Sequence, residues 1–99
     1  IPLSSQQSVV TSSAQKATVA QVLKAADEAL VSVEGEIVRH IRGDDYELKD
    51  ATGTIRVDID DSLISAQNLK AGTKVSVVAE VDVSRFKATK LDVQQITIQ

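Results

Sequence analysis

Residues 50–60 read DATGTIRVDID. The first four residues have the composition of a tight turn, in which Gly53 is free to take a positive φ angle. The apolar residues Ile55, Val57 and Ile59 then alternate with polar ones. Alternation with a period of two is typical of a β-strand with one buried and one exposed face. This segment therefore predicts a turn followed by a half-buried strand.

The same alternation occurs in four other segments and predicts four further short strands. Their inward-facing positions are Val31, Val33, Gly35 and Ile37 in the first, Tyr46 and Leu48 in the second, Val75, Val77, Ala79 and Val81 in the third, and Leu91 and Val93 in the fourth. The alternation changes phase after Ile37 and again at residues 94–95, which predicts a β-bulge at each place. Residues 61–72, with Asp61 or Ser62 as candidate N-cap and Gly72 as a stop signal, predict one or two short helical turns.

A short helix is predicted before the first strand. Thr18 and Gln21 have the spacing of a capping box. The apolar residues that follow recur at intervals of three and four, as expected for about two to three helical turns: Val19, Val22, Leu23 and Ala26. So short a helix needs to dock against the sheet. Residues 1–17 are rich in Ser and Gln, and we interpret them as a flexible leader to a domain over residues 18–99.

Five short strands, with a helical connection between the third and the fourth, match the order of an OB-fold. Closure into a barrel is the favoured arrangement, because an open five-stranded sheet would expose long apolar edges. We therefore predict a mainly β protein. It is a five-stranded OB-fold Greek-key barrel with a short N-terminal α-helix and a short helical turn between strands three and four.

The composition excludes several classes of function. The 99 residues, 42% hydrophobic and 25% charged, correspond to one small globular domain. A net charge of −3 and only two aromatic residues argue against a platform that stacks nucleic-acid bases. There is no cysteine, and His40 alone cannot make a zinc site. Without a nucleophile elbow, a phosphate loop or a dinucleotide fingerprint, we predict neither an enzyme nor a bound cofactor. No apolar run approaches the ~20 residues of a membrane span.

Candidate binding residues lie on the outer face of the first three strands. Arg39, Lys49 and Arg56 occupy outward positions there, on the face that usually takes the ligand in OB-folds. Acidic residues are interspersed with these bases and cancel their long-range field. Such a face suits a polar ligand, for example a glycan or a peptide, and it equally suits a solvated surface without a ligand. Phe86, in the loop between the last two strands, is a further contact candidate unless it folds back over the barrel end.

Asp58, Asp60 and Asp61 form the most suggestive polar cluster. Calcium prefers six or more oxygen ligands, and carboxylates at this spacing can supply two or three of them. The alternative is that the three are solvated strand-end charges and a helix cap, because the glycine-containing loop and terminal Glu of an EF-hand are absent. Asp58 is also placed to pair with Lys49 or Arg39 on a neighbouring strand.

Residues 50–60 resemble the D-x-T-G-x-I-x-V-D-I-D signature of the bacterial OB-fold family. Flanking motifs keep the family's order over residues 18–98: Thr18-Val19, Val33-Glu34-Gly35, Glu80-Val81-Asp82 and Leu91-Asp92-Val93. The sequence departs from the family pattern at Ala79, where glycine is usual, and at Leu63 or Ile64, where an aromatic is expected. The resemblance implies a small non-enzymatic protein exported to the periplasm and associated with stress tolerance.

We therefore expect a periplasmic binding protein, its export signal removed, that contributes to envelope stress tolerance. The expected ligand is a cell-wall glycan or peptide on the face of strands one to three, and an envelope protein is a further possible partner. Two alternatives stay open: a protein-interaction or structural module without a small ligand, and cation binding through Asp58, Asp60 and Asp61. Nucleic acid is not an expected partner.

Overall fold

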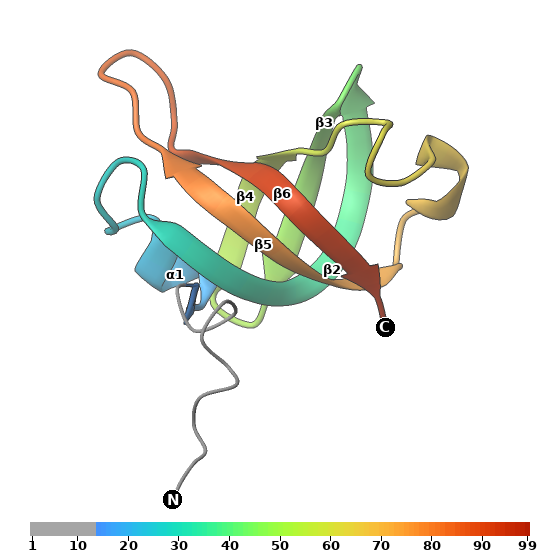
Figure 1. The fold of residues 1–99 in the computed structure, drawn as a ribbon, viewed down its shortest axis with the longest axis horizontal. Helices are drawn as coiled ribbons and strands as arrows, with labels where there is room; N and C mark the ends of the chain where they lie inside the picture. Colours follow the sequence, from blue (N-terminus) through green and yellow to red (C-terminus); the bar gives the residue numbers. More distant parts are fainter. Residues whose placement is uncertain (1–13) are drawn as a thin grey trace, which may run out of the picture.

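The computed structural model describes residues 14–99, and Figure 1 shows them as a closed β-barrel with one small helix beside it. In chain order the elements are β1 (Gln15–Lys16), α1 (Val19–Val22), β2 (Leu30–Arg42), β3 (Asp45–Asp50), β4 (Gly53–Asp58), the 3-10 helix η4 (Ala66–Asn68), β5 (Lys74–Asp82) and β6 (Lys90–Ile98). Among these residues, no helix has the length and apolar character needed to cross a bilayer.

The sheet order confirms the predicted OB-fold barrel. The strands follow one another as β1-β2-β3-β4-β6-β5, and a further pairing of β2 with β5 closes the last five into a ring. The β4–β6 contact is parallel, whereas the other contacts within the ring are antiparallel. The ring leaves no long apolar edge open, which is the physical reason for closure.

The long strand β2 contributes to two parts of the barrel and bends between them. Residues 30–36 pair with β5, and residues 36–42 pair with β3. Gly35 lies at the bend, where a Cβ atom would collide with the backbone carbonyl oxygen of Lys49. The bulge predicted after Ile37 is confirmed, and so is the one at residues 94–95, because the register shifts at both places.

Side chains from every strand of the ring fill the barrel. All predicted inward positions are buried except Gly35. The core consists of Val19, Val22, Val31, Val33, Ile37, Tyr46, Leu48, Ile55, Val57, Ile59, Leu69, Val75, Val77, Ala79, Val81, Leu91 and Val93. Leu69 comes from the β4–β5 connection, where the predicted helical turn is the 3-10 helix Ala66–Asn68.

Helix α1 is shorter than the apolar spacing predicts. The capping box at Thr18 is confirmed, and Val19 and Val22 are fully buried. The helix ends after one turn, because the next hydrogen bonds, from the Lys24 and Ala25 amides, reach back only three residues. This tighter winding leaves Leu23 exposed, so the predicted two to three turns are wrong.

Regular structure begins before the predicted boundary at residue 18. Residues 1–13 of the predicted leader lie outside the described residues, but Gln15–Lys16 form a short strand parallel to β2. The amide of Ala17 extends this contact by donating to the carbonyl oxygen of Ser32 at 2.9 Å. A pattern of alternation cannot reveal a two-residue strand, because so few residues carry no period.

Candidate functional site

The turn between β3 and β4 holds the start of α1. The Asp50 carboxylate accepts hydrogen bonds from the amides of Thr52 at 2.7 Å and Gly53 at 3.2 Å, and from the amide of Val19 at 2.9 Å. The Thr52 hydroxyl donates to the same carboxylate and accepts from the amide of Ala20 at 3.0 Å. These bonds satisfy amides that a helix N-terminus leaves free. The aspartate and threonine of the DATG turn are therefore structural residues.

Burial and these hydrogen bonds change the pKa of the Asp50 carboxyl. Partial burial raises the pKa of the Asp50 carboxyl, but the hydrogen bonds from Thr52, Val19 and Gly53 outweigh that effect. The net result is a pKa below the usual value for aspartate, because hydrogen bonds to the ionised form favour it. Asp50 is therefore held as a carboxylate, and this charge stabilises the first turn of the helix.

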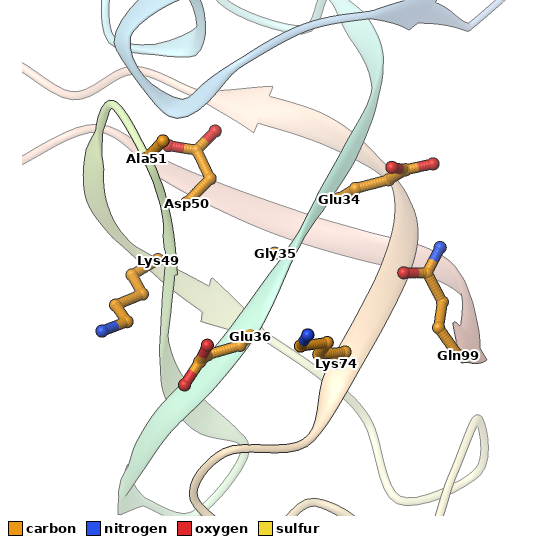
Figure 2. A pocket seen from close by; sticks show the side chains of 8 residues that line it. All are labelled: Glu34, Gly35, Glu36, Lys49, Asp50, Ala51, Lys74 and Gln99. Carbon is orange, nitrogen blue, oxygen red and sulfur yellow. The ribbon is translucent and has the colours of Figure 1, made fainter.

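Two surface hollows lie at opposite ends of the same strands. The first, of about 440 Å³, surrounds the bend of β2 at Gly35. Figure 2 shows the side chains that line this hollow, arranged around Gly35, which has no side chain of its own. They belong to Glu34, Glu36, Lys49, Asp50, Ala51, Lys74 and Gln99. Lys49 thus lines this hollow, whereas the other predicted binding residues Arg39 and Arg56 do not. Acidic and basic groups are nearly balanced here.

The second hollow, which we call the loop cleft, has a volume of about 290 Å³ and lies beside the β5–β6 loop. In Figure 1 this loop is the orange connection that projects beyond the barrel. The cleft is lined by Arg42, Asp45, Arg56, Asp82, Ser84, Lys87, Ala88 and Lys90. It therefore combines the predicted residue Arg56 with loop residues at the end of the barrel where β3 begins and β4 ends.

Arg39 and Arg56 lie in one cross-strand row of the outer face. Glu47 of β3 is the register partner of both. Arg39 forms an ion pair with Glu47, with 3.0 Å between Nε and Oε1. On its other side, Arg56 faces Lys90 of β6. In this row Glu47 therefore separates Arg39 from Arg56, and Arg39 is already paired with it, whereas Arg56 lies beside a second base.

Phe86 is 90% exposed in the β5–β6 loop and does not fold back over the barrel. Its amide donates to the Ser84 hydroxyl at 3.2 Å, which shapes the loop from within. The amide of Val83 donates to the Asp27 carboxylate at 2.9 Å and ties the base of the loop to the segment before β2. Phe86 lies between the cleft residues Ser84 and Lys87 in the sequence and does not itself line the loop cleft.

The predicted acidic cluster is spread over three environments. Asp58 lies 4.0 Å from Lys90 and not beside Lys49 or Arg39, because the free edge of β4 pairs with β6. Burial raises the pKa of the Asp58 carboxyl, and burial together with the nearby carboxylates outweighs the opposing effect of Lys90. Within residues 14–99, no three His, Cys, Asp or Glu side chains are placed to hold a metal ion.

Asp60 caps the turn after β4, a role that the sequence assigned to Asp61 or Ser62. Its carboxylate accepts a hydrogen bond from the Ser62 amide at 2.8 Å. This bond, with one from the Ser62 side chain, lowers the pKa of the fully exposed Asp60 carboxyl. Asp61 is exposed in the same turn. Asp60 is thus a turn residue at the end of a strand, which agrees with the alternative, structural interpretation of the acidic cluster.

Sequence reasoning did not single out Arg42, Lys87 and Lys90, which line the loop cleft. Arg42 stands at a turn in the sequence and Lys87 in a loop, so neither follows the strand alternation that identified the other bases. Their position next to the loops would have identified them, because OB-folds commonly bind ligands with the loops that flank the strand 2–3 face.

Comparisons with known proteins agree on one family. Residues 2–98 match the sequence profile described as bacterial OB fold (BOF) protein. The chain is 43% identical over 65 residues to the calcium-regulated OB-fold protein CarO of Pseudomonas aeruginosa. The matched residues cover 66% of this chain and 56% of CarO. It is 35% identical over 79 residues to protein YgiW of Escherichia coli K12, covering 80% of this chain and 60% of YgiW. The chain thus spans less than two thirds of these relatives.

Solved structures show the same barrel. The hypothetical protein ygiW from E. coli superposes with a TM-score of 0.79 at 33% identity, covering 88% of this chain and 92% of that one. The telomere capping protein Ten1 superposes with a TM-score of 0.68 at 14% identity, covering 87% of this chain and 81% of Ten1. At that identity the likeness to Ten1 extends to the fold alone. None of these names describes an enzymatic family.

Proposed function

Because this chain belongs to the bacterial OB-fold (BOF) protein family, we propose that it is a non-enzymatic binding protein that takes a polar ligand in the loop cleft. The proposed ligand is a cell-wall glycan or peptide. The observation that carries the proposal is the convergence of Arg56 from β4 and Lys87 from the β5–β6 loop on one cleft. Loops held on a rigid barrel are common binding elements, and OB-folds bind ligands in this region.

The loop cleft supports the proposal better than the hollow around Gly35 does. The basic residues of the loop cleft include Arg56. Its cross-strand neighbour Glu47 already forms an ion pair with Arg39. The hollow around Gly35 combines three acidic with two basic residues, and one of them, Asp50, is engaged in holding α1. Charged groups that lack an internal partner are available to a ligand, whereas groups engaged in the fold are not.

We further propose that the protein acts in the periplasm and contributes to tolerance of envelope stress. The support for both proposals is membership of the family and not the geometry of the cleft. Cell fractionation with antibodies against the chain tests the location. Survival of a deletion strain under peroxide, cadmium, acid or cationic peptide tests the role, with complementation by the wild-type gene as the control.

An amide NMR titration of the whole chain with soluble cell-wall fragments tests the binding proposal. We expect saturable shifts at Arg56, Ser84 and Lys87, and we expect Arg56→Glu to abolish them. Lys49→Glu is the matched control, because it makes a change of charge of the same size on the same outer face, and Lys49 lines the hollow around Gly35 and not the loop cleft. Shifts centred on Gly35, or binding unchanged by Arg56→Glu, would remove the loop cleft from the proposal.

The same titration decides between the proposal and its two alternatives. A spectrum that no cell-wall fragment changes would favour a protein-interaction module without a small ligand. Calcium, which appears in the name of the relative CarO, is the probe for the cation alternative. Shifts at Asp58, Asp60 and Asp61 on addition of Ca²⁺, with a higher melting temperature, would favour that alternative, since a ligand of the native state raises stability.

A further inference from the structure

We infer that the loop cleft selects an acidic sugar. Arg42, Arg56 and Lys87 bind a carboxylate or phosphate group that is attached to the sugar ring. The inference deepens the proposed function, on which it rests, by naming the class of ligand that the same cleft takes. The inference rests on the charged side chains that line the cleft and on the polar groups beside them.

Within residues 14–99, no carboxylate lies within ion-pair distance of Arg56. Its register partner on β3 is Glu47, but that carboxylate is bound to Arg39 at 3.0 Å. Its register partner on β6 is Lys90, which carries a charge of the same sign. Arg56 therefore lies between an occupied acid and a second base, an arrangement that favours an external anion.

Lys90 differs from the other three bases of the cleft. Its ammonium lies 3.9 Å from Asp82 and 4.0 Å from Asp58, so two carboxylates share its charge. For Arg42, Arg56 and Lys87, by contrast, residues 14–99 place no carboxylate within ion-pair distance. This includes Asp45, although it is the register partner of Arg42. Three bases without an ion-pair partner among these residues thus line one cleft in a protein whose net charge is −3.

The remaining polar groups of the cleft suit the hydroxyl groups of a sugar. Asp45, which forms no ion pair within residues 14–99, supplies carboxylate oxygens as acceptors, and the Ser84 hydroxyl keeps a proton that it can donate. A carboxylate can accept hydrogen bonds from several hydroxyls, which are the commonest donors on a sugar ring. The combination of bases without partners and carboxylate acceptors therefore matches a molecule that carries one acidic group and several hydroxyls.

A peptide bound as an added strand fits the cleft less well. In the ring, β4 is hydrogen-bonded to β3 and β6, and β6 to β4 and β5. A strand can be added only where a sheet edge is free, and at Arg56 and Lys90 both edges of β4 and β6 are already paired. The volume of about 290 Å³ is at the lower end of the ~300–1,000 Å³ of small-molecule sites, which suits a ligand of one or a few rings.

Phe86 supplies an exposed apolar surface on the loop that contributes Ser84 and Lys87 to the same cleft. Its ring is 90% exposed, and it lies in the loop between Ser84 and Lys87. A flat apolar ring that the fold leaves in water gains free energy when a ligand covers it. The C–H face of a pyranose ring can cover an aromatic ring in this way while its acidic substituent reaches the bases.

The test titrates the whole chain with three related sugars: glucuronate, glucose 6-phosphate and glucose. We expect at least one of the two acids to bind about tenfold or more tightly than glucose, which carries no charge, because hydrogen bonds between charged groups are the stronger ones. The shifts should include the amides of Arg56, Lys87 and Phe86. Stronger binding of glucuronate identifies a carboxylate as the ligand group, and stronger binding of glucose 6-phosphate identifies a phosphate.

Two variants assign the effect to the cleft. Arg56→Gln removes one uncompensated charge and should weaken binding of the acids about tenfold, whereas Lys49→Gln should leave it unchanged. Both residues are exposed, and equal melting temperatures of the two variants establish that they fold alike. Binding of the acids no tighter than that of glucose, or insensitive to Arg56→Gln, overturns the inference. If cell-wall fragments still shift the cleft, the proposed function survives that result, but if no fragment binds, both fail.

Discussion

The carboxylate of Asp50 lies 2.9 Å from the amide nitrogen of Val19, 31 residues earlier in the chain, and accepts its hydrogen bond. The same carboxylate binds the amides of Thr52 and Gly53 in its own turn. A helix of four residues has no stability of its own. It is held by this turn and by the burial of Val19 and Val22 in the barrel.

Asp50→Ala should lower the free energy of unfolding by about 1–3 kcal/mol, because it leaves partly buried amides without an acceptor. Urea unfolding of the whole chain measures the change. Asp61→Ala is the control, since Asp61 is an exposed aspartate near the end of the next strand. Equal unfolding midpoints of the two variants would show that the Asp50–Val19 bond does not stabilise the fold.

Acid should weaken the fold partly through the same residue. The pKa of Asp50 is lower in the folded chain than its ordinary value of 3.8. A group with a depressed folded pKa contributes stability above its unfolded pKa and loses that contribution as the pH falls through the folded one. Below about pH 4, the unfolding free energy of the wild type should therefore fall more steeply than that of Asp50→Asn. Parallel pH profiles of the two proteins would contradict this linkage.

Gly35→Ala should destabilise the barrel by more than about 2 kcal/mol, because the new methyl group meets the backbone carbonyl of Lys49 and the strand has to shift. Gly43→Ala is the matched control. Gly43 has open space around its Cβ position, and its φ of 53° should cost only about 1–2 kcal/mol. A smaller loss for Gly35→Ala than for Gly43→Ala, measured by urea unfolding, would mean that β2 tolerates a side chain at its bend.

Arg39→Gln should weaken binding of an acidic sugar although Arg39 does not line the loop cleft. The substitution releases Glu47, which is then available to Arg56 on the neighbouring strand. We expect a loss of about threefold to tenfold in affinity, as for a partly screened ion pair. The double variant Arg39→Gln/Glu47→Gln should restore binding, which makes a double-mutant cycle the measurement. Additive losses in the cycle would exclude this coupling.

Phe86→Ala should separate binding from stability. The ring is 90% exposed, so we expect the free energy of unfolding to stay within about 0.5 kcal/mol of the wild type. Affinity for the acidic sugar should fall several-fold, because the exposed ring next to the cleft residue Lys87 is lost. Tyr46→Ala provides the contrast, since that ring is 1% exposed and its loss should cost about 3–5 kcal/mol. Unchanged affinity in Phe86→Ala would remove the loop tip from the binding surface.

Local alternation along the chain determined which side chains enter the barrel. Val57, Val77 and Leu91 are all buried as their period of two predicts, because successive side chains of a strand point to opposite faces whatever the strand pairs with. The phase changes at Ile37 and at residues 94–95 likewise revealed bulges, which are local events of one strand. The order of the strands and their turns was enough to identify the barrel.

The candidate site depended on which strand edges meet, and only the tertiary structure decided that. The parallel pairing of β4 with β6 places Lys90 beside Asp58, whereas the sequence pointed to Lys49 or Arg39. The hydrogen bonds that hold strands together are made by the backbone, which is the same for every residue type except proline. The spacing of side chains therefore says which face a charge occupies but not which charge lies next to it on another strand.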